Sequence, residues 1–350
     1  MTMLHYPKDR DPSFDAFRGL AIIAVVAIHA IPWRSYWDYR ILVYRQLLDF
    51  AVPAFIFISG YWSSKKTLQS FKDYKKFLAR RLARVLIPYF FWSFIFLGRA
   101  AMKSDDIDMY GMVLKLLTGG ASFHFYFVVM ITQFYLMTPV LQYVGRRRYG
   151  NETIFLLNIV YLSFLYHYRL HNHWFLEYPY YLVHSPFFGW TIFYQIGLWM
   201  GNNDDKNFIS RNERIFILPA IIVSLLVAGI EAINILSKYN NLEFAVCALK
   251  YSSFLYSICV ILGFIFIREY FKCWPKLLIT LGNYSFGIYL IHTIILNRVV
   301  SIIPKSNIIS SFQPLYELTV ILMTISICLV VIWISRKLLP RPIYSKVLGF

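Results

Sequence analysis

Long apolar runs, separated by short polar stretches, dominate this chain. Ten of them are candidates for membrane-crossing helices, each of which needs about 20 predominantly apolar residues. They cover residues 14–31, 41–62, 85–101, 123–144, 153–168, 187–201, 215–236, 244–267, 277–303 and 315–334. The pattern predicts an all-α integral membrane protein, built as a bundle of about ten transmembrane helices.

The first apolar run is expected to be a retained span rather than a cleaved signal peptide. Asp9, Asp11 and Asp15 dilute the basic stretch before it, and no small-residue cleavage site follows it. The segments between the runs leave no room for a separate folded unit. We therefore expect residues 1–350 to form a single polytopic membrane domain with no appended soluble domain.

Composition excludes two other classes of protein. Of the 350 residues, 58% are hydrophobic and 15% are charged, whereas soluble domains carry about 25% charged residues. The mean hydropathy is +0.53, so a water-soluble globule is excluded, and the 19% aromatic content excludes a disordered chain. The cysteines form no CxxC pair and no Cys/His cluster with metal-ligand spacing, so we expect no metal site.

The distribution of charge predicts an orientation in the membrane. The chain carries 35 Lys and Arg against 18 Asp and Glu, for a net charge of +17. With the N-terminus inside, 24 of the 35 basic residues fall on the inner side, which agrees with the positive-inside rule and predicts both termini in the cytoplasm. Because the basic residues are spread over many loops, an anionic lipid surface is a better partner than nucleic acid.

Two ionisable side chains lie on one stripe of the first span. Arg18 and His29 are eleven residues apart, which is close to three full helical turns and about 16 Å of rise. Asp15 lies one turn before Arg18 and could orient it. Arg18 could instead extend its charge to the interface, and His29 could be a structural histidine, but ionisable residues inside a span commonly mark function.

A basic stretch precedes the third span. Lys76, Arg80 and Arg84 recur at intervals of four, and Arg81 lies on the neighbouring stripe. One interpretation is a basic amphipathic helix on anionic lipid. The other is a cytoplasmic phosphate site, because the arginine fork binds phosphate through two hydrogen bonds.

Two later spans add polar groups at membrane depth. Ser285, Tyr289 and His292 follow each other at i, i+4 and i+7, which places them on one helix face. His124 opens the fourth span, and Tyr135 follows it within the membrane. A second and third intramembrane histidine strengthen the expectation of an internal polar cavity.

Together these motifs resemble membrane acyltransferase family 3, the bacterial integral-membrane O-acyltransferases. The resemblance extends over most of the chain in the family's order, although nothing between residues 169 and 267 is diagnostic. Its motifs are Arg18 followed by ten residues and His29, FIFISGYW with Ser59 and Gly60, Arg81-Leu82-Ala83-Arg84 before Pro88, His124 to Val128, and Ser285 to His292.

The resemblance implies an enzyme of the bacterial cytoplasmic membrane. It would move an acyl group, most simply acetyl from acetyl-CoA, to a hydroxyl of a cell-envelope glycan or its lipid-linked precursor. His29 would act as general base or transient acyl carrier, assisted by Arg18 and Asp15. Arg18, Arg81 and Arg84 would hold the donor phosphates.

The other residues that we single out would line the cavity or orient the acceptor. They are Ser59, His124, Tyr135, Ser285, Tyr289 and His292. An acyl thioester is already activated, so the reaction needs neither a metal nor a permanently bound cofactor.

A transporter or flippase that exports a glycan or small anion is the alternative. Ten spans, intramembrane histidines and basic entrances suit such a protein as well. Transporters often consist of related halves with paired, broken helices, and the sequence has no convincing correspondence between its halves.

Overall fold

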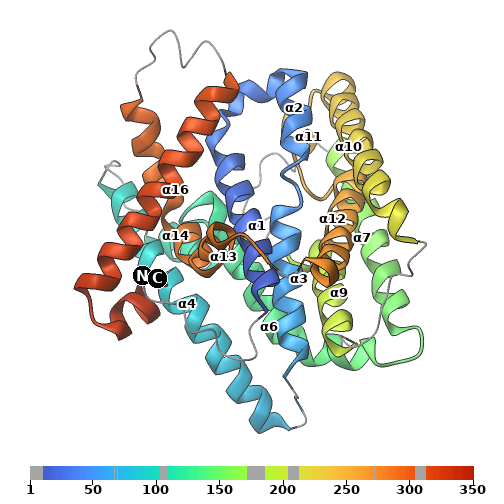
Figure 1. Ribbon diagram of the computed structural model, residues 1–350, viewed down its shortest axis with the longest axis horizontal. Helices are drawn as coiled ribbons and strands as arrows, with labels where there is room; N and C mark the ends of the chain where they lie inside the picture. Colours follow the sequence, from blue (N-terminus) through green and yellow to red (C-terminus); the bar gives the residue numbers. More distant parts are fainter. Residues whose placement is uncertain are drawn as a thin grey trace.

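The computed structural model describes residues 11–66, 68, 70–102, 109–171, 186–203, 213–271, 273–303 and 313–350. Throughout this part of the chain the regular structure is helical and contains no β-strand. The long helices lie side by side around an interior that α1 and α3 share (Figure 1). The all-α prediction is confirmed.

Within the described ranges, eight helices have 18 residues or more. They are α1 (Pro12–Ala30), α4 (Phe71–Ala101), α6 (Tyr126–Gly145), α7 (Gly150–His171), α10 (Ile217–Tyr239), α12 (Tyr251–Tyr270), α14 (Ser285–Ile302) and α16 (Gln313–Leu338). The shorter α-helices are α2 (Tyr39–Gln46), α3 (Ala51–Ser64), α5 (Met109–Thr118), α9 (Thr191–Asn202), α11 (Leu242–Ala245) and α13 (Lys276–Asn283). Single turns complete the set: η1 (Trp33–Trp37), η2 (Phe123–Phe125), η4 (Phe187–Trp190), η5 (Glu213–Phe216) and the π-helical η6 (Ile343–Val347).

Eight helical segments of the described chain are long and apolar enough to cross a membrane. They correspond to eight of the predicted spans and confirm a multi-pass membrane protein. The predicted spans 153–168 and 187–201 fall on α7 and on the 12-residue α9, which are not among the eight. The predicted number of ten is therefore not reproduced.

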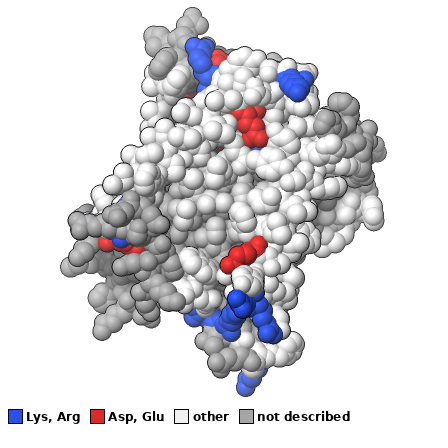
Figure 2. Space-filling model, turned by 90° about the vertical axis from the view of Figure 1, so that its right-hand side faces the viewer, with Lys and Arg blue, Asp and Glu red and all other residues white. Residues whose placement is uncertain are grey.

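The outside of the bundle is apolar. In α10 the most apolar window has a mean hydropathy of 2.5, yet only 22% of it is buried, and α16 is similar at 2.6 and 33%. Most of the Lys and Arg side chains visible in Figure 2 lie toward the upper and lower ends of that face. Such an exterior is stable only in contact with lipid, because exposed apolar area of this extent is unfavourable in water.

The structure corrects the start of one predicted span and shows that others are interrupted. The third helix begins at Phe71 and not near Val85, because the basic stretch continues into the span; Ser70 caps it by accepting a hydrogen bond from the Asp73 amide at 3.1 Å. Three other predicted spans are interrupted: the second between α2 and α3, the eighth between α11 and α12, and the ninth at Tyr284 between α13 and α14.

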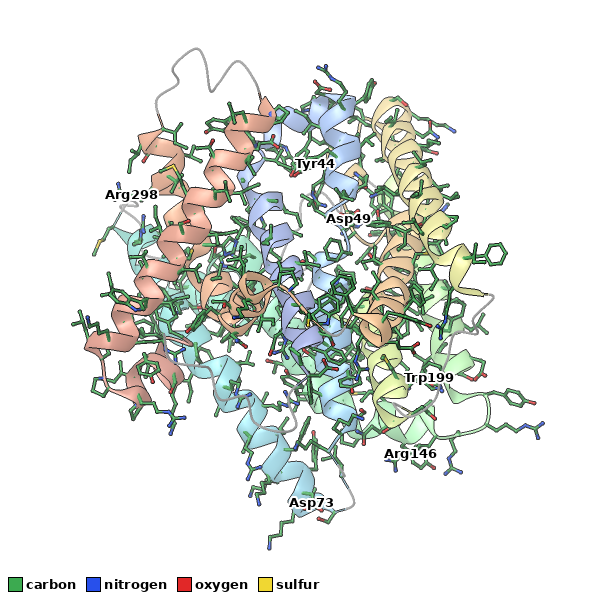
Figure 3. All side chains as sticks on the ribbon, viewed as in Figure 1. Tyr44, Asp49, Asp73, Arg146, Trp199 and Arg298 are labelled. Carbon is green, nitrogen blue, oxygen red and sulfur yellow. The ribbon has the colours of Figure 1, made fainter. Side chains whose placement is uncertain are left out.

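Buried polar side chains interact with the residues at the interruption between α2 and α3. The Tyr256 hydroxyl donates to the Leu47 carbonyl at 3.0 Å. Lys250, which is fully buried, donates to Gln46 Oε1 at 2.8 Å and lies 3.7 Å from Asp49 Oδ2. Figure 3 shows Asp49 inside the bundle. Irregular backbone at membrane depth is tolerated where protein groups surround it in this way.

Close backbone contact between α3 and α9 holds the centre of the bundle. A Cβ added to Gly60 would collide with the Tyr194 carbonyl, and one added to Gly197 would collide with the Phe57 carbonyl. Small residues allow such an approach between membrane helices, where dispersion contacts supply much of the association energy. This packing fixes the wall of the interior that carries Ser59.

Candidate functional site

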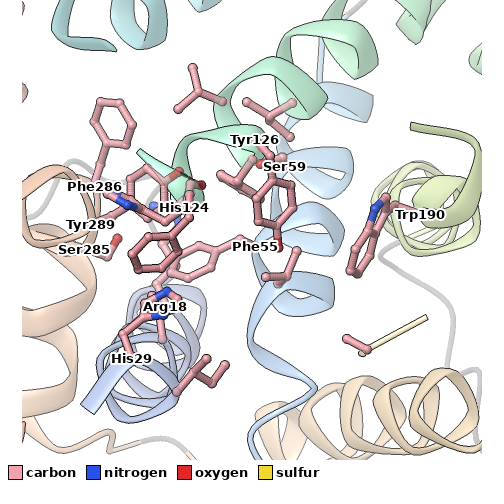
Figure 4. A pocket seen from close by; sticks show the side chains of 18 of the residues that line it. Arg18, His29, Phe55, Ser59, His124, Tyr126, Trp190, Ser285, Phe286 and Tyr289 are labelled. Atoms are coloured by element: carbon pink, nitrogen blue, oxygen red, sulfur yellow. Dashed lines mark hydrogen bonds between the residues drawn. The ribbon is translucent and has the colours of Figure 1, made fainter. Parts of the chain in front are cut away.

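A cavity of about 650 Å³ opens inside the bundle, between α1, α3, α4, α6 and α14 (Figure 4). Its size is that of a pocket for a substrate or cofactor fragment. Most of the residues singled out from the sequence line it: Arg18, His29, Ser59, Arg81, Arg84, His124, Tyr135, Ser285 and Tyr289. Asp15 and His292 stand directly behind this lining.

The start of α1 sets the direction of its polar stripe. Pro12 occupies the first turn, and Asp11 caps the helix by accepting from the Ser13 amide at 2.9 Å. Arg268 Nε on α12 donates to Asp11 Oδ2 at 2.6 Å. From this anchored start Arg18 and His29 both face the cavity, as their spacing predicted.

Arg18 is held by a carboxylate of its own helix. Its Nη1 lies 3.4 Å from Asp15 Oδ1, one turn earlier, and Asp15 is only 1% exposed. The Arg18 side chain keeps 29% of its surface exposed. The predicted positioning of Arg18 by Asp15 is therefore present, with the guanidinium still accessible from the cavity.

The other two predicted phosphate ligands come from α4. Arg81 Nη2 donates to the Trp62 carbonyl at 3.1 Å, and its guanidinium lies 5.4 Å from the Tyr135 ring. Arg84, one turn away, is exposed. The basic stretch thus belongs to a helix that enters the bundle and presents two arginines to the cavity, rather than lying wholly on the lipid surface.

Three imidazoles from three separate elements meet at the inner part of the cavity. The ring of His29 on α1 stacks on that of His292 on α14, with centroids 5.2 Å apart. His124, from η2, lies 4.9 Å from His292 and 6.3 Å from His29. The Phe123 ring packs edge-on against His29 at 4.8 Å.

Hydrogen bonds at Nδ1 fix the His292 and His124 rings, and the Nε2 atom of each ring is left without a hydrogen-bond partner. His292 Nδ1 lies 2.7 Å from the Tyr289 carbonyl, so this nitrogen carries the proton and Nε2 is the acceptor in the neutral ring. His124 Nδ1 meets the Ser122 hydroxyl at 3.0 Å. Both Nε2 atoms are buried without a hydrogen-bond partner, and each such atom costs about 1–3 kcal/mol.

The cavity has a second polar end, which the sequence analysis did not predict. Its lining includes Tyr36, Arg45, Asp49, Trp190 and Glu243. A signal was available, because Arg45 and Asp49 stand four residues apart inside the predicted second span, where charged residues are costly unless paired. The structure pairs them directly in a buried salt bridge.

Tyr36 links this second end to the imidazole-bearing helix. Its hydroxyl donates to the Ile28 carbonyl at 3.0 Å. Burial raises the pKa of the Tyr36 phenol, so the hydroxyl remains protonated and able to donate. The residue before His29 is thereby tied to the turn that carries Tyr36.

Three arginines line one internal cavity, and three imidazoles meet at its inner part. An unprotonated imidazole nitrogen can take a proton or attack an acyl carbon, so the arrangement suits acid–base or nucleophilic chemistry. In the described part of the chain, no three His, Cys, Asp or Glu side chains are grouped to hold a metal ion.

Comparison with known proteins identifies the family. The model of the acyltransferase domain family matches residues 11–335, so the chain belongs to this family of membrane acyltransferases. A Staphylococcus aureus (strain MRSA252) protein named as a poly-beta-1,6-N-acetyl-D-glucosamine export protein is 25% identical over 301 residues, covering 84% of this chain and 81% of its own. The Bacillus subtilis (strain 168) protein YfiQ, named as a membrane-bound acyltransferase, is 23% identical over 260 residues, with 71% and 68% covered.

A shorter match involves a third kind of protein. A serine/alanine racemase of Enterococcus gallinarum is 28% identical over 146 residues, which are 40% of this chain and 21% of the racemase. No solved structure matches the chain significantly.

Proposed function

We propose that this protein is an integral-membrane O-acyltransferase of the bacterial cytoplasmic membrane. It takes an acyl group, acetyl in the simplest case, from cytoplasmic acyl-CoA. It transfers this group to a hydroxyl of a cell-envelope glycan or its lipid-linked precursor. Membership of the acyltransferase family and the name of YfiQ support the reaction class, and the name of the staphylococcal relative supports a glycan as acceptor.

The observation that best supports the proposal is a single cavity whose two ends carry different kinds of side chain. Arg18, Arg81 and Arg84 suit the phosphates of a CoA nucleotide, while Trp190 and Glu243 line the same cavity and suit a polar, ring-shaped acceptor. His29 lines the cavity beside the imidazole cluster. A donor entering at the basic end and an acceptor at the other would meet there.

Two chemical routes use these residues. In the first, His29 takes the proton of the acceptor hydroxyl as its oxygen attacks the thioester carbonyl, and the imidazolium then protonates the departing CoA thiolate. In the second, one ring nitrogen of His29 attacks the thioester carbonyl, and the departing CoA thiolate takes the proton of the other ring nitrogen. The acyl-imidazole then passes its acyl group to the acceptor hydroxyl, whose proton returns to the ring. In both routes Arg18 holds the donor and Asp15 positions Arg18.

Replacement of His29 tests the proposal. His29→Gln keeps a hydrogen-bonding group but removes the base, so we expect glycan acylation to fall by at least about 10²–10⁴-fold. Mass spectrometry of envelope glycans from a deletion strain that carries each variant measures this. Wild-type acylation by a normally inserted His29→Gln protein would show that His29 is structural.

An export function is the second candidate. Two interrupted helix pairs, α2/α3 and α13/α14, contribute to the cavity, and discontinuous helices are frequent at transporter binding sites. The staphylococcal relative bears the name of an export protein. Movement of an unmodified glycan that continues without any acyl-CoA would favour this candidate over the enzyme.

A further inference from the structure

The chain that follows α16 turns back into the bundle. After Leu338 it forms η6 (Ile343–Val347) and then runs through Leu348 to Phe350 against α4 and α14 (Figure 1). We call residues 343–350 the return segment. Trp92 Nε1 on α4 donates to the Leu348 carbonyl at 3.1 Å, and the Trp92 and Phe350 rings lie 6.1 Å apart.

Specific residues place the return segment there. Gly349 has a φ of +77°, which few residues other than glycine adopt. On α14, a Cβ added to Gly287 would lie 2.9 Å from Phe350 Cδ1 and 3.3 Å from the Gly349 carbonyl oxygen. The guanidinium of Arg336 lies over the Tyr344 ring at 5.3 Å, which anchors the start of the segment.

The return segment is a wall of the cavity and not only a surface feature. Ser345, Gly349 and Phe350 line the same cavity as Arg84 and His29. None of the motifs recognised in the sequence includes these positions.

Along the bundle, the return segment lies at a depth between that of Arg84 and that of the imidazoles. Gly349 packs near Pro88, one turn beyond Arg84 on α4. Phe350 packs on Gly287, which precedes His292 by five residues, or about 7.5 Å of helix rise. The segment therefore lies between the level of the phosphate-binding arginine and the level of the imidazoles.

We propose that the return segment is a subsite for the pantetheine arm of the CoA donor. A donor whose phosphates rest at Arg84 and whose thioester reaches His29 must lay its linking arm along this wall. The Phe350 ring lines the cavity and is backed by the Trp92 ring, so it offers the apolar surface that a thin, largely aliphatic arm requires. This inference rests on the proposed acyl-CoA donor.

Two ligands separate the subsite from the phosphate site. CoA has the phosphates and the arm, whereas adenosine 3′,5′-bisphosphate has phosphates and lacks the arm. Titration calorimetry on the full chain in lipid nanodiscs gives the affinity of each. We expect Phe350→Ala to weaken CoA binding about tenfold and to leave binding of the bisphosphate unchanged. Arg84→Ala should weaken both.

Matched variants guard against a folding artefact. Phe94 is also on α4, is 62% exposed and does not line the cavity, so Phe94→Ala should change neither affinity. Gly287→Ala should displace the segment and reproduce the selective loss of CoA binding. Gly98→Ala, at a glycine with nothing within 4 Å, should not.

Each alternative result has a distinct meaning. Equal CoA binding by wild type and Phe350→Ala overturns the subsite while the donor assignment stands. Equal weakening of both ligands by Phe350→Ala shows a structural role and also overturns it. Failure of the wild-type protein to bind either ligand refutes the acyl-CoA donor, and the subsite with it.

Discussion

At the scale of single residues, the site combines one accessible imidazole with two that are enclosed. His29 and His124 both line the cavity, but His124 is only 2% exposed, and His292 behind them is 0% exposed. The Tyr289 carbonyl fixes the proton of His292 on Nδ1.

The arginines of α4 lead to a prediction about the donor. Arg84 is exposed and lines the cavity, so its guanidinium is available to a phosphate. Arg84→Ala should weaken acetyl-CoA binding by about 1.5–3 kcal/mol, the contribution of a hydrogen bond to a charged group. Titration calorimetry measures it, with Arg80→Ala, an exposed neighbour outside the cavity lining, as the control. Unchanged binding by Arg84→Ala would instead favour a role at the lipid surface.

At the scale of helices, the interrupted pair α2/α3 depends on a lysine from another part of the chain. Lys250 bridges Gln46, Ser253 and the Cys247 carbonyl at 2.8 Å each, beside Asp49. Disruption of a buried network of this kind leaves polar groups without hydrogen-bond partners.

Lys250→Met should therefore destabilise the protein strongly. Gln46 Oε1 and the Cys247 carbonyl would lose their buried charged donor, at about 1–3 kcal/mol for each group left unsatisfied, while Asp49 would keep Arg45. Thermal unfolding of the protein in detergent micelles should show a lowered midpoint. Lys115→Met, on the exposed face of α5, should leave the midpoint unchanged. Similar midpoints for both variants would contradict a structural role for Lys250.

The helices were predictable where contact with lipid requires a long apolar helix. Long apolar runs such as that of α10 can only be helical in a bilayer, and the eleven-residue spacing fixed the common face of Arg18 and His29. The interruptions at Leu47 and Tyr284 were missed because hydropathy averaged over a whole span conceals short polar stretches such as Arg45-Gln46 and Gly282-Asn283. The convergence of His124 with His292 was expected only as a shared cavity, because no periodicity along one helix reports which helix lies beside it.

At the scale of the whole molecule, the two ends of the bundle differ in their loops. Asp73 and Arg146 lie at the same lower end (Figure 3), and both belong to segments predicted to be cytoplasmic. Arg40, at the start of α2, belongs to a segment predicted to face outward, and its side chain is 90% exposed.

Thiol labelling tests this orientation in intact cells. In a background with Cys273 changed to Ser, Arg40→Cys should react with a membrane-impermeant maleimide, whereas Lys72→Cys should react only after the membrane is permeabilised. The positive-inside distribution of Lys and Arg is the physical reason. The opposite labelling pattern would place Arg81 and Arg84 on the outer side and exclude a cytoplasmic CoA donor.

The enclosed nitrogens of His124 and His292 also bear on how such a sequence persists. An apolar residue of similar volume at either position would remove an unsatisfied polar atom and would make the resting fold more durable. Selection for stability alone would therefore replace both histidines with apolar residues. Their retention is the compromise between stability and activity that the proposed role of the imidazoles predicts.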